Sequence, residues 1–118
     1  MRNFDVFYGE EKTASVEIGQ STVKVTRYVL HPVKQIFAKD ELTRYEFGEV
    51  LRSRCWEEGR KNLDKYLQKL GLKEYDVYKI CEQTHGVRIG DYTWFRFAGE
   101  TLTAKEALKW VEELDETD

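Results

Sequence analysis

Histidine and cysteine, the residue types best suited to acid–base, nucleophilic and zinc chemistry near neutral pH, are few in this chain. It has two histidines, His31 and His85, and two cysteines, Cys55 and Cys81. On a helix, Cys81 and His85 would point to one side, because they are four residues apart. Adding Cys55 and His31 would complete a tetrahedral zinc set. Structural zinc sites use closely spaced pairs of ligands, whereas these four are scattered. We therefore expect no metal site and no cofactor.

A catalytic cysteine is the second chemistry to weigh. A thiolate forms near neutral pH only beside a base or a cation, which His85 or the arginines around Cys55 could supply. The sequence contains no nucleophile elbow, no family-specific cysteine signature and no glycine-rich phosphate loop. We therefore expect a protein without catalytic residues rather than an enzyme.

Basic residues gather around Trp56, between two expected helices. Acidic residues are interleaved with them, which is more typical of a solvated, mixed-charge surface than of a nucleic-acid stripe. Trp and Arg are nevertheless the residues most enriched at the energetic centres of protein interfaces. The candidates for contact with a protein partner in this stretch are Arg52, Arg54, Trp56 and Arg60.

A second candidate surface lies in residues 84–97, which read THGVRIGDYTWFRF. Strand alternation sends Phe95 and Phe97 into the core and places Trp94 and Arg96 together on the opposite face. That pair is either stacked on the surface or part of a docking face. The residues of this segment that the expected fold leaves for a partner are Arg88, Asp91, Trp94 and Arg96.

The periodicity of apolar residues predicts the elements that hold these side chains. Up to residue 25, apolar residues alternate with period two in three runs separated by glycine-containing breaks. This pattern predicts a three-stranded antiparallel meander. Three helices should follow: one after the capping box Thr43–Glu46, one from Asn62 to Gly71, and one starting near Asp76.

The third helix should stop at Gly86, with His85 in its last turn beside the free carbonyls. Residues 87–97 then fit a second hairpin that turns at Gly90–Asp91, or a single strand preceded by an ordered loop. A final helix should begin at the capping box Thr103–Glu106. We therefore predict an α+β fold in which about four helices cover one face of an antiparallel sheet.

Length and composition predict a single domain over residues 1–118. Hydrophobic residues make up 41%, with one proline, a balance typical of a folded globule. The net charge of −3 makes direct nucleic-acid binding unexpected. The chain has no C-x-x-C pair, no apolar run of membrane-spanning length and no signal-peptide-like start, so we expect a cytoplasmic protein without membrane contact.

Part of the chain resembles the small module that accompanies bacterial HipA-type kinase toxins. The resemblance covers residues 51–97. The module reads R-x(5)-R, then a leucine-rich helix ending near a glycine, then a G-L-S-L-S-D-Q-Y-W-like segment. The matching residues here are Leu51, Arg52, Arg54 and Arg60, then Leu63, Leu67, Leu70, Gly71 and Leu72, then Gly86, Asp91 and Trp94.

The whole chain is also similar to small uncharacterised proteins of bacterial mobile elements. Compact anti-defence inhibitors, including anti-CRISPR proteins, are frequent in that setting. Both likenesses imply a non-catalytic module that occupies the surface of a protein partner. The leading hypothesis is a regulator or inhibitor of a HipA-like kinase, and the alternative is an anti-CRISPR inhibitor that blocks a Cas nuclease.

Overall fold

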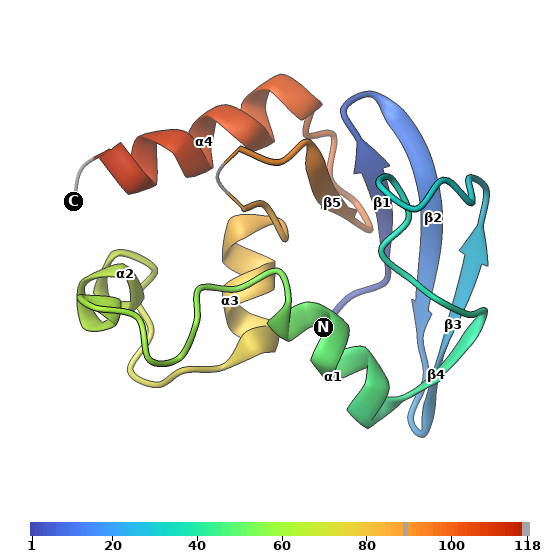
Figure 1. The fold of residues 1–118 in the computed structure, drawn as a ribbon, viewed down its shortest axis with the longest axis horizontal. Helices are drawn as coiled ribbons and strands as arrows, with labels where there is room; N and C mark the ends of the chain where they lie inside the picture. The colour runs from blue at the N-terminus through green and yellow to red at the C-terminus, as the bar shows by residue number, and fades with distance from the viewer. Residues whose placement is uncertain (89, 117–118) are drawn as a thin grey trace.

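A computed structural model describes residues 1–88 and 90–116, with residues 111–116 described by their backbone alone. The fold is α+β, with one antiparallel sheet in the strand order β4-β3-β2-β1-β5 (Figure 1). The strands are β1 (Phe4–Tyr8), β2 (Glu11–Ile18), β3 (Thr22–Arg27), β4 (Glu41–Thr43) and β5 (Thr93–Phe97). The helices are α1 (Arg44–Arg52), α2 (Leu63–Lys69), α3 (Val77–Thr84) and α4 (Ala104–Glu116).

The predicted meander is confirmed in β1, β2 and β3. Val16 pairs with Phe4 on one side and with Val25 on the other, so apolar residues line up across three strands. All three are buried in the main core. The alternation of period two therefore sets both the pairing register and the inner face of the sheet.

Strand β4 was not predicted, because its three residues are too few to show a period. Leu42 is its only buried residue, and it pairs with Val23 of β3. Thr43 ends the strand and also begins α1, where it forms the predicted capping box with Glu46. Because Thr43 is also the N-cap of α1, the sequence pattern at this point indicates the start of a helix and does not indicate the short strand before it.

The predicted second hairpin is wrong, and the alternative of one strand after a loop is what forms. Val87 and Arg88 lie in irregular backbone, and Ile89 lies outside the described residues. Strand β5 pairs with β1 instead, with Phe95 opposite Val6. Val87 is a loop residue that is buried in a small hydrophobic cluster with Trp94, on the face of the sheet opposite the main core.

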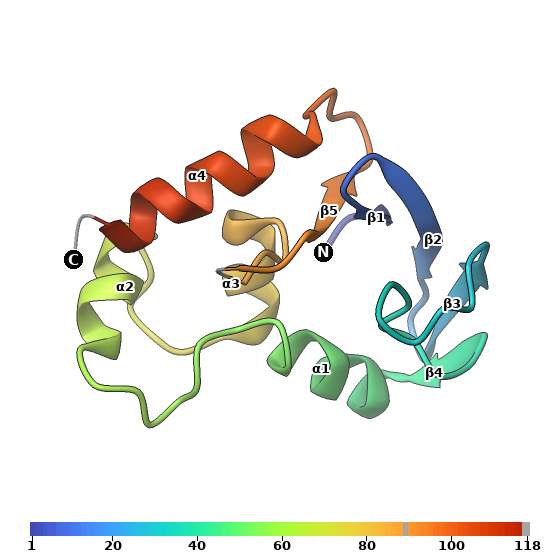
Figure 2. The ribbon, with the colours of Figure 1, turned by 45° about the horizontal axis from the view of Figure 1, so that its top comes forward.

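Helices cover both faces of the sheet, which corrects the prediction that they share one. Helix α1 packs against α3 and against β3 and β4. Helix α4 lies on the opposite side, against β5 (Figure 2). There Ala107 of α4 packs with Phe7 and Trp94, whose stacked rings are 4.8 Å apart. Phe95 and Phe97 face the main core, as expected.

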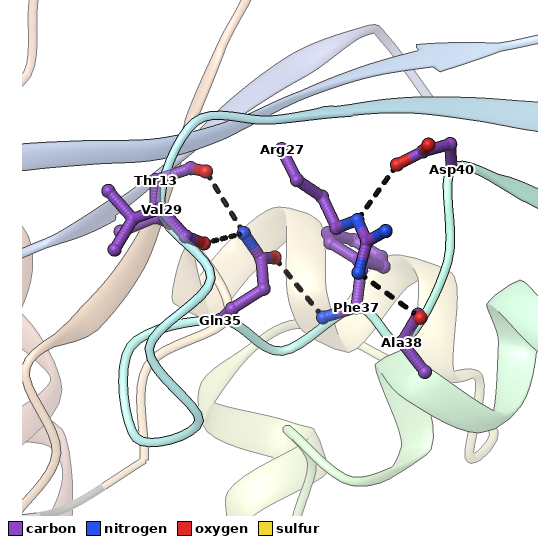
Figure 3. A network of polar contacts seen from close by, with 7 residues as sticks. All are labelled: Thr13, Arg27, Val29, Gln35, Phe37, Ala38 and Asp40. Atoms are coloured by element: carbon purple, nitrogen blue, oxygen red, sulfur yellow. Dashed lines mark hydrogen bonds and ion pairs between the residues drawn. The ribbon is translucent and has the colours of Figure 1, made fainter.

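The connection from β3 to β4 is held by hydrogen bonds of the Gln35 and Arg27 side chains (Figure 3). Gln35 donates from Nε2 to the carbonyls of Thr13 and Val29, at 3.0 and 2.7 Å. Arg27 bonds to Asp40 at 2.8 Å, where the chain enters β4. These bonds place Phe37, which is 2% exposed, in the main core.

The outer edge of β5 has its backbone donors satisfied within the chain. Ala98 donates to Asn3, so the even-numbered residues face β1 and the odd-numbered N–H groups point away from it. The outward donors and their acceptors are Thr93 to the Asp91 carboxylate at 3.0 Å, Phe95 to the His85 carbonyl at 2.7 Å, and Phe97 to the Glu100 carboxylate at 2.7 Å.

Candidate binding surface

The structure brings together the two regions that the sequence singled out. Arg54, in the turn after α1, donates from Nε to the carbonyl of Gly86 at 2.9 Å. Its Nη1 lies 2.7 Å from a carboxylate oxygen of Asp91. Arg88 donates to the carbonyl of Ser53 at 2.9 Å. The end of α1 is therefore bonded to the loop that precedes β5.

Arg54 is a buried structural residue, so its prediction as a partner contact is corrected. Only 8% of it is exposed, and its Nη2 has no hydrogen-bond partner within the part of the chain that the structure describes. Burial alone would raise the pKa of the Asp91 carboxyl. The N–H of Thr93 and the Arg54 guanidinium outweigh burial and hold that pKa below its ordinary value.

Trp94 is also part of the interior rather than a docking face. It is 2% exposed, and its indole Nε1 donates to the carbonyl of Gly9 at 2.7 Å. Arg96 is half-buried, with its guanidinium 4.6 Å from the centre of the Phe7 ring. Sequence alternation placed both residues on the outer face correctly, but α4 packs on that face and buries Trp94.

Three of the predicted contacts, Arg52, Trp56 and Arg60, lie in a row with two tyrosines. This row is here called the arginine–aromatic strip: Arg52, Tyr75, Trp56, Tyr66 and Arg60. The Arg52 guanidinium lies 5.7 Å from the Tyr75 ring centre, and the Tyr75 hydroxyl donates to the Trp56 carbonyl at 2.7 Å. The rings of Trp56 and Tyr66 are 4.6 Å apart. Arg60 lies 4.4 Å from the Tyr66 ring centre and donates to its hydroxyl at 2.8 Å.

The strip has a buried centre, and its two ends are exposed to solvent. Arg52 and Arg60 are exposed, Trp56 and Tyr75 are half-buried, and Tyr66 is 1% exposed. Burial raises the pKa of the Tyr75 hydroxyl above its ordinary value, so the donor of the bond to the Trp56 carbonyl is kept. Two cations are thus held over aromatic rings at fixed positions, a geometry worth about 0.5–1 kcal/mol for each exposed pair.

Acidic side chains limit the positive charge of the strip. Arg52 pairs with Glu58 at 3.2 Å and with Glu49 at 3.7 Å. Arg88 adds a third exposed guanidinium nearby, since it bonds to Ser53, the neighbour of Arg52. The surface is therefore mixed in charge, as the sequence predicted.

Sequence reasoning missed the two tyrosines of the strip. Tyr66 lies on α2 beside the buried Leu67, so the leucine period concealed it. Tyr75 precedes α3 and belongs to no regular element. The signal that could have identified them is the recurrence of aromatic residues among basic ones over residues 52–75.

The histidines and cysteines do not converge on one point. His85 ends α3 with a left-handed backbone (φ 55°), as expected for a helix stop, and its Nε2 lies 2.9 Å from Glu100. His31 accepts from the N–H of Val33 in the β3–β4 connection. Among the described residues, no group of three or more His, Cys, Asp or Glu side chains could hold a metal ion.

In the same part of the chain, no helix is both long and apolar enough to cross a bilayer.

A shallow hollow of about 460 Å³ lies over polar residues of the sheet. Asp5 is directly opposite Arg96, and Glu17 is directly opposite Lys24. Ser15 donates to Asp5 at 2.7 Å. Opposite charges therefore face each other across neighbouring strands, which leaves no strong field of one sign to select a ligand.

Comparison with protein-family models, with curated proteins and with solved structures gave no match. The likenesses to the HipA-associated module and to mobile-element proteins therefore remain predictions. Several residues that carry the first likeness have structural roles here. Trp94 fills the cluster under α4, Asp91 binds Arg54, and Gly86 lies against the Phe95 ring.

Proposed function

We propose that this chain is a small non-catalytic regulator that binds an acidic surface of a protein partner through the arginine–aromatic strip. The observation that carries the proposal is the placing of two exposed guanidiniums, Arg52 and Arg60, over the rings of Tyr75 and Tyr66. Trp56 lies between the two pairs and is half-buried.

Such an arrangement favours binding because it is already ordered. Immobilising a long side chain at an interface costs about 0.5–1.5 kcal/mol, and an arginine stacked on a ring has lost part of that freedom beforehand. Each guanidinium carries five N–H donors, so one that is already bonded within the chain can still bind a carboxylate of a partner. Arg, Tyr and Trp are also the residue types that dominate interface energetics.

A HipA-like kinase is the partner that we propose first. The support is the sequence likeness over residues 51–97, in which Arg60 of the strip corresponds to the second arginine of the R-x(5)-R pattern. Both cysteines are free thiols, which fits the reducing cytoplasm where such a kinase would act. The alternative is an inhibitor of a Cas nuclease, suggested by the small acidic chain. An undiminished nuclease rate with the protein in excess would exclude any nuclease so tested.

The test is a direct binding measurement with a purified HipA-like kinase. We expect Arg52→Glu together with Arg60→Glu to weaken binding at least tenfold, because each reversal opposes an acidic partner. The control is a double variant with the same change of charge outside the strip, Lys24→Glu with Lys105→Glu, both at exposed positions. Circular dichroism checks that every variant is folded.

The possible results separate the partner from the surface. Absence of binding by the unaltered protein would overturn the kinase as partner. Binding that survives both strip reversals would overturn the strip as the surface. Binding to single-stranded nucleic acid that the same reversals abolish would assign the strip to nucleic acid instead, because stacked arginines also suit bases.

A further inference from the structure

Cys55 and Cys81 form a pair that the proposed function does not use. Cys55 lies in the turn after α1, and Cys81 lies in α3. They are 5% and 0% exposed, and their sulfur atoms are 3.7 Å apart. Two thiols from separate segments are thus in contact inside the core.

The two thiols are held in place by backbone carbonyls. The Sγ of Cys55 lies 3.3 Å from the Leu51 carbonyl and 3.8 Å from the Val77 carbonyl. The Sγ of Cys81 lies 3.5 Å from the same Leu51 carbonyl. Its bond to Cys55 and its burial raise the pKa of Cys81, so the Cys81 sulfur is held as a protonated thiol.

The cysteines lie at the two ends of residues 56–80, the segment that carries α2. Figure 1 shows α2 far from the sheet, reached from α1 by one irregular stretch and left by another that leads into α3. The segment also contains Trp56, Tyr66 and Tyr75. A bond between the two sulfur atoms would close this segment into a covalent loop.

We propose that Cys55 and Cys81 are a reversible redox-modification site, at which a disulfide closes residues 56–80 into a loop. The sulfur atoms must approach by about 1.6 Å to reach bonding distance. Cys55 can supply the movement, because it lies outside the helices, whereas Cys81 is fixed within α3. The inference stands whether or not the strip binds a partner.

Oxidised glutathione is the oxidant in the proposed step. The Cys55 thiol loses its proton and attacks one glutathione sulfur, which forms a mixed disulfide and releases the first reduced glutathione. The Cys81 thiol then loses its proton and attacks the Cys55 sulfur, which releases the second. Two electrons pass from the protein thiols to the glutathione disulfide, and the two protons end on the released thiols. Cys55 reacts first because it is the more exposed, and local opening of its turn admits the oxidant.

The test uses the full, reduced chain incubated under native conditions with oxidised glutathione. Mass spectrometry of the intact protein should show the loss of two hydrogen atoms with no glutathione attached, and peptide mapping should join Cys55 to Cys81. The thermal midpoint should rise by about 10 °C, because the cross-link closes a loop of moderate length, and dithiothreitol should reverse the rise.

The matched variants are Cys55→Ala and Cys81→Ala. Each leaves one thiol, so neither can lose two hydrogen atoms within one chain, and neither should gain thermal stability with the oxidant. The proposal is overturned if the wild type takes up two glutathiones, forms dimers, or reacts only in denaturant. It is also overturned if the intramolecular disulfide lowers the midpoint. The comparison of oxidised with reduced wild type decides the outcome even if a variant does not fold.

Discussion

Arg54 Nη1 lies 2.7 Å from the Asp91 carboxylate, and this ion pair joins the end of α1 to the loop that leads into β5. The same guanidinium also holds the Gly86 carbonyl. One buried side chain thus positions two points of a loop whose only other described tie to this turn is the bond from Arg88 to Ser53.

Replacement of Arg54 by Met should strongly destabilise the fold. The change removes the guanidinium from the Gly86 carbonyl and from the Asp91 carboxylate, which keeps its bond from the Thr93 N–H, so we expect a loss of about 3 kcal/mol of unfolding free energy. Urea titration followed by tryptophan fluorescence measures it. Arg52→Met is the control on the surface and should change stability by no more than about 1 kcal/mol, because it removes only exposed ion pairs and one exposed cation–π contact. Equal effects in the two variants would show that the Arg54 ion pair is not structural.

Trp94→Ala should lower stability by about 4 kcal/mol, because the change opens a cavity between Phe7 and α4. Trp94→Phe keeps most of the packing but removes the bond to the Gly9 carbonyl, so we expect a loss of about 1–2 kcal/mol. Both are measured by urea unfolding. If Trp94→Ala were as stable as the wild type, the conclusion that Trp94 packs in the interior would be wrong, and the predicted position at the surface would be favoured.

Gly86→Ala should cost far more than Gly71→Ala. Both glycines have a left-handed backbone, with φ of +65° and +73°. An added Cβ at Gly71 meets no atom within 4 Å, whereas at Gly86 it would overlap the Phe95 ring. We expect a loss of about 1 kcal/mol at Gly71 from the backbone alone, and a further loss of about 1–3 kcal/mol at Gly86 from the clash. Similar midpoints of thermal unfolding would contradict this packing.

Stability should fall in acid through Asp91 and Glu100. Burial opposes ionisation of Glu100, but its bonds to His85 and to the Phe97 N–H outweigh burial and lower its pKa, as Arg54 and Thr93 do for Asp91. A lowered folded-state pKa means that the unfolded chain binds protons first as the pH falls. The stabilisation is therefore complete well above the ordinary carboxyl range near pH 4, and is lost as the pH drops through the folded values.

The measurement for this pH dependence is the unfolding free energy between pH 7 and pH 3. Glu100→Gln should lose less stability over that range than the wild type, because the substituted group no longer titrates. Glu17→Gln, at an exposed position on β2, is the control for replacing a carboxylate by an amide. Identical slopes for all three proteins would show that Glu100 does not contribute.

The features that the sequence predicted correctly are local ones. The capping boxes at Thr43 and Thr103 involve residues three positions apart, and both form. The face of the sheet that α4 covers depends on contacts between distant segments. Alternation in β5 predicted that Trp94 and Arg96 share the outer face, but it could not predict that a helix packs on that face. Arg54 looked exposed because an arginine is rarely buried. Only the folded loop brings Asp91 and Gly86 to it.

Only part of the candidate surface could be predicted, because the rest depends on contacts between distant segments. Arg52, Trp56 and Arg60 were identified by residue type, and they do form one row. Tyr66 and Tyr75, which connect them, come from α2 and from the segment before α3. Their roles depend on how the chain folds back after α2, which the periodicity of a short helix does not specify.

The bonded outer edge of β5 determines how another molecule can approach this protein. A strand arriving there finds the N–H groups of Thr93, Phe95 and Phe97 already engaged by the chain's own acceptors. The opposite edge, β4, offers three residues and begins with the charged Glu41. Sheet extension by a second molecule, the usual first step of strand-mediated aggregation and domain swapping, is therefore disfavoured at both ends. Recognition of another molecule is then left to side-chain contacts.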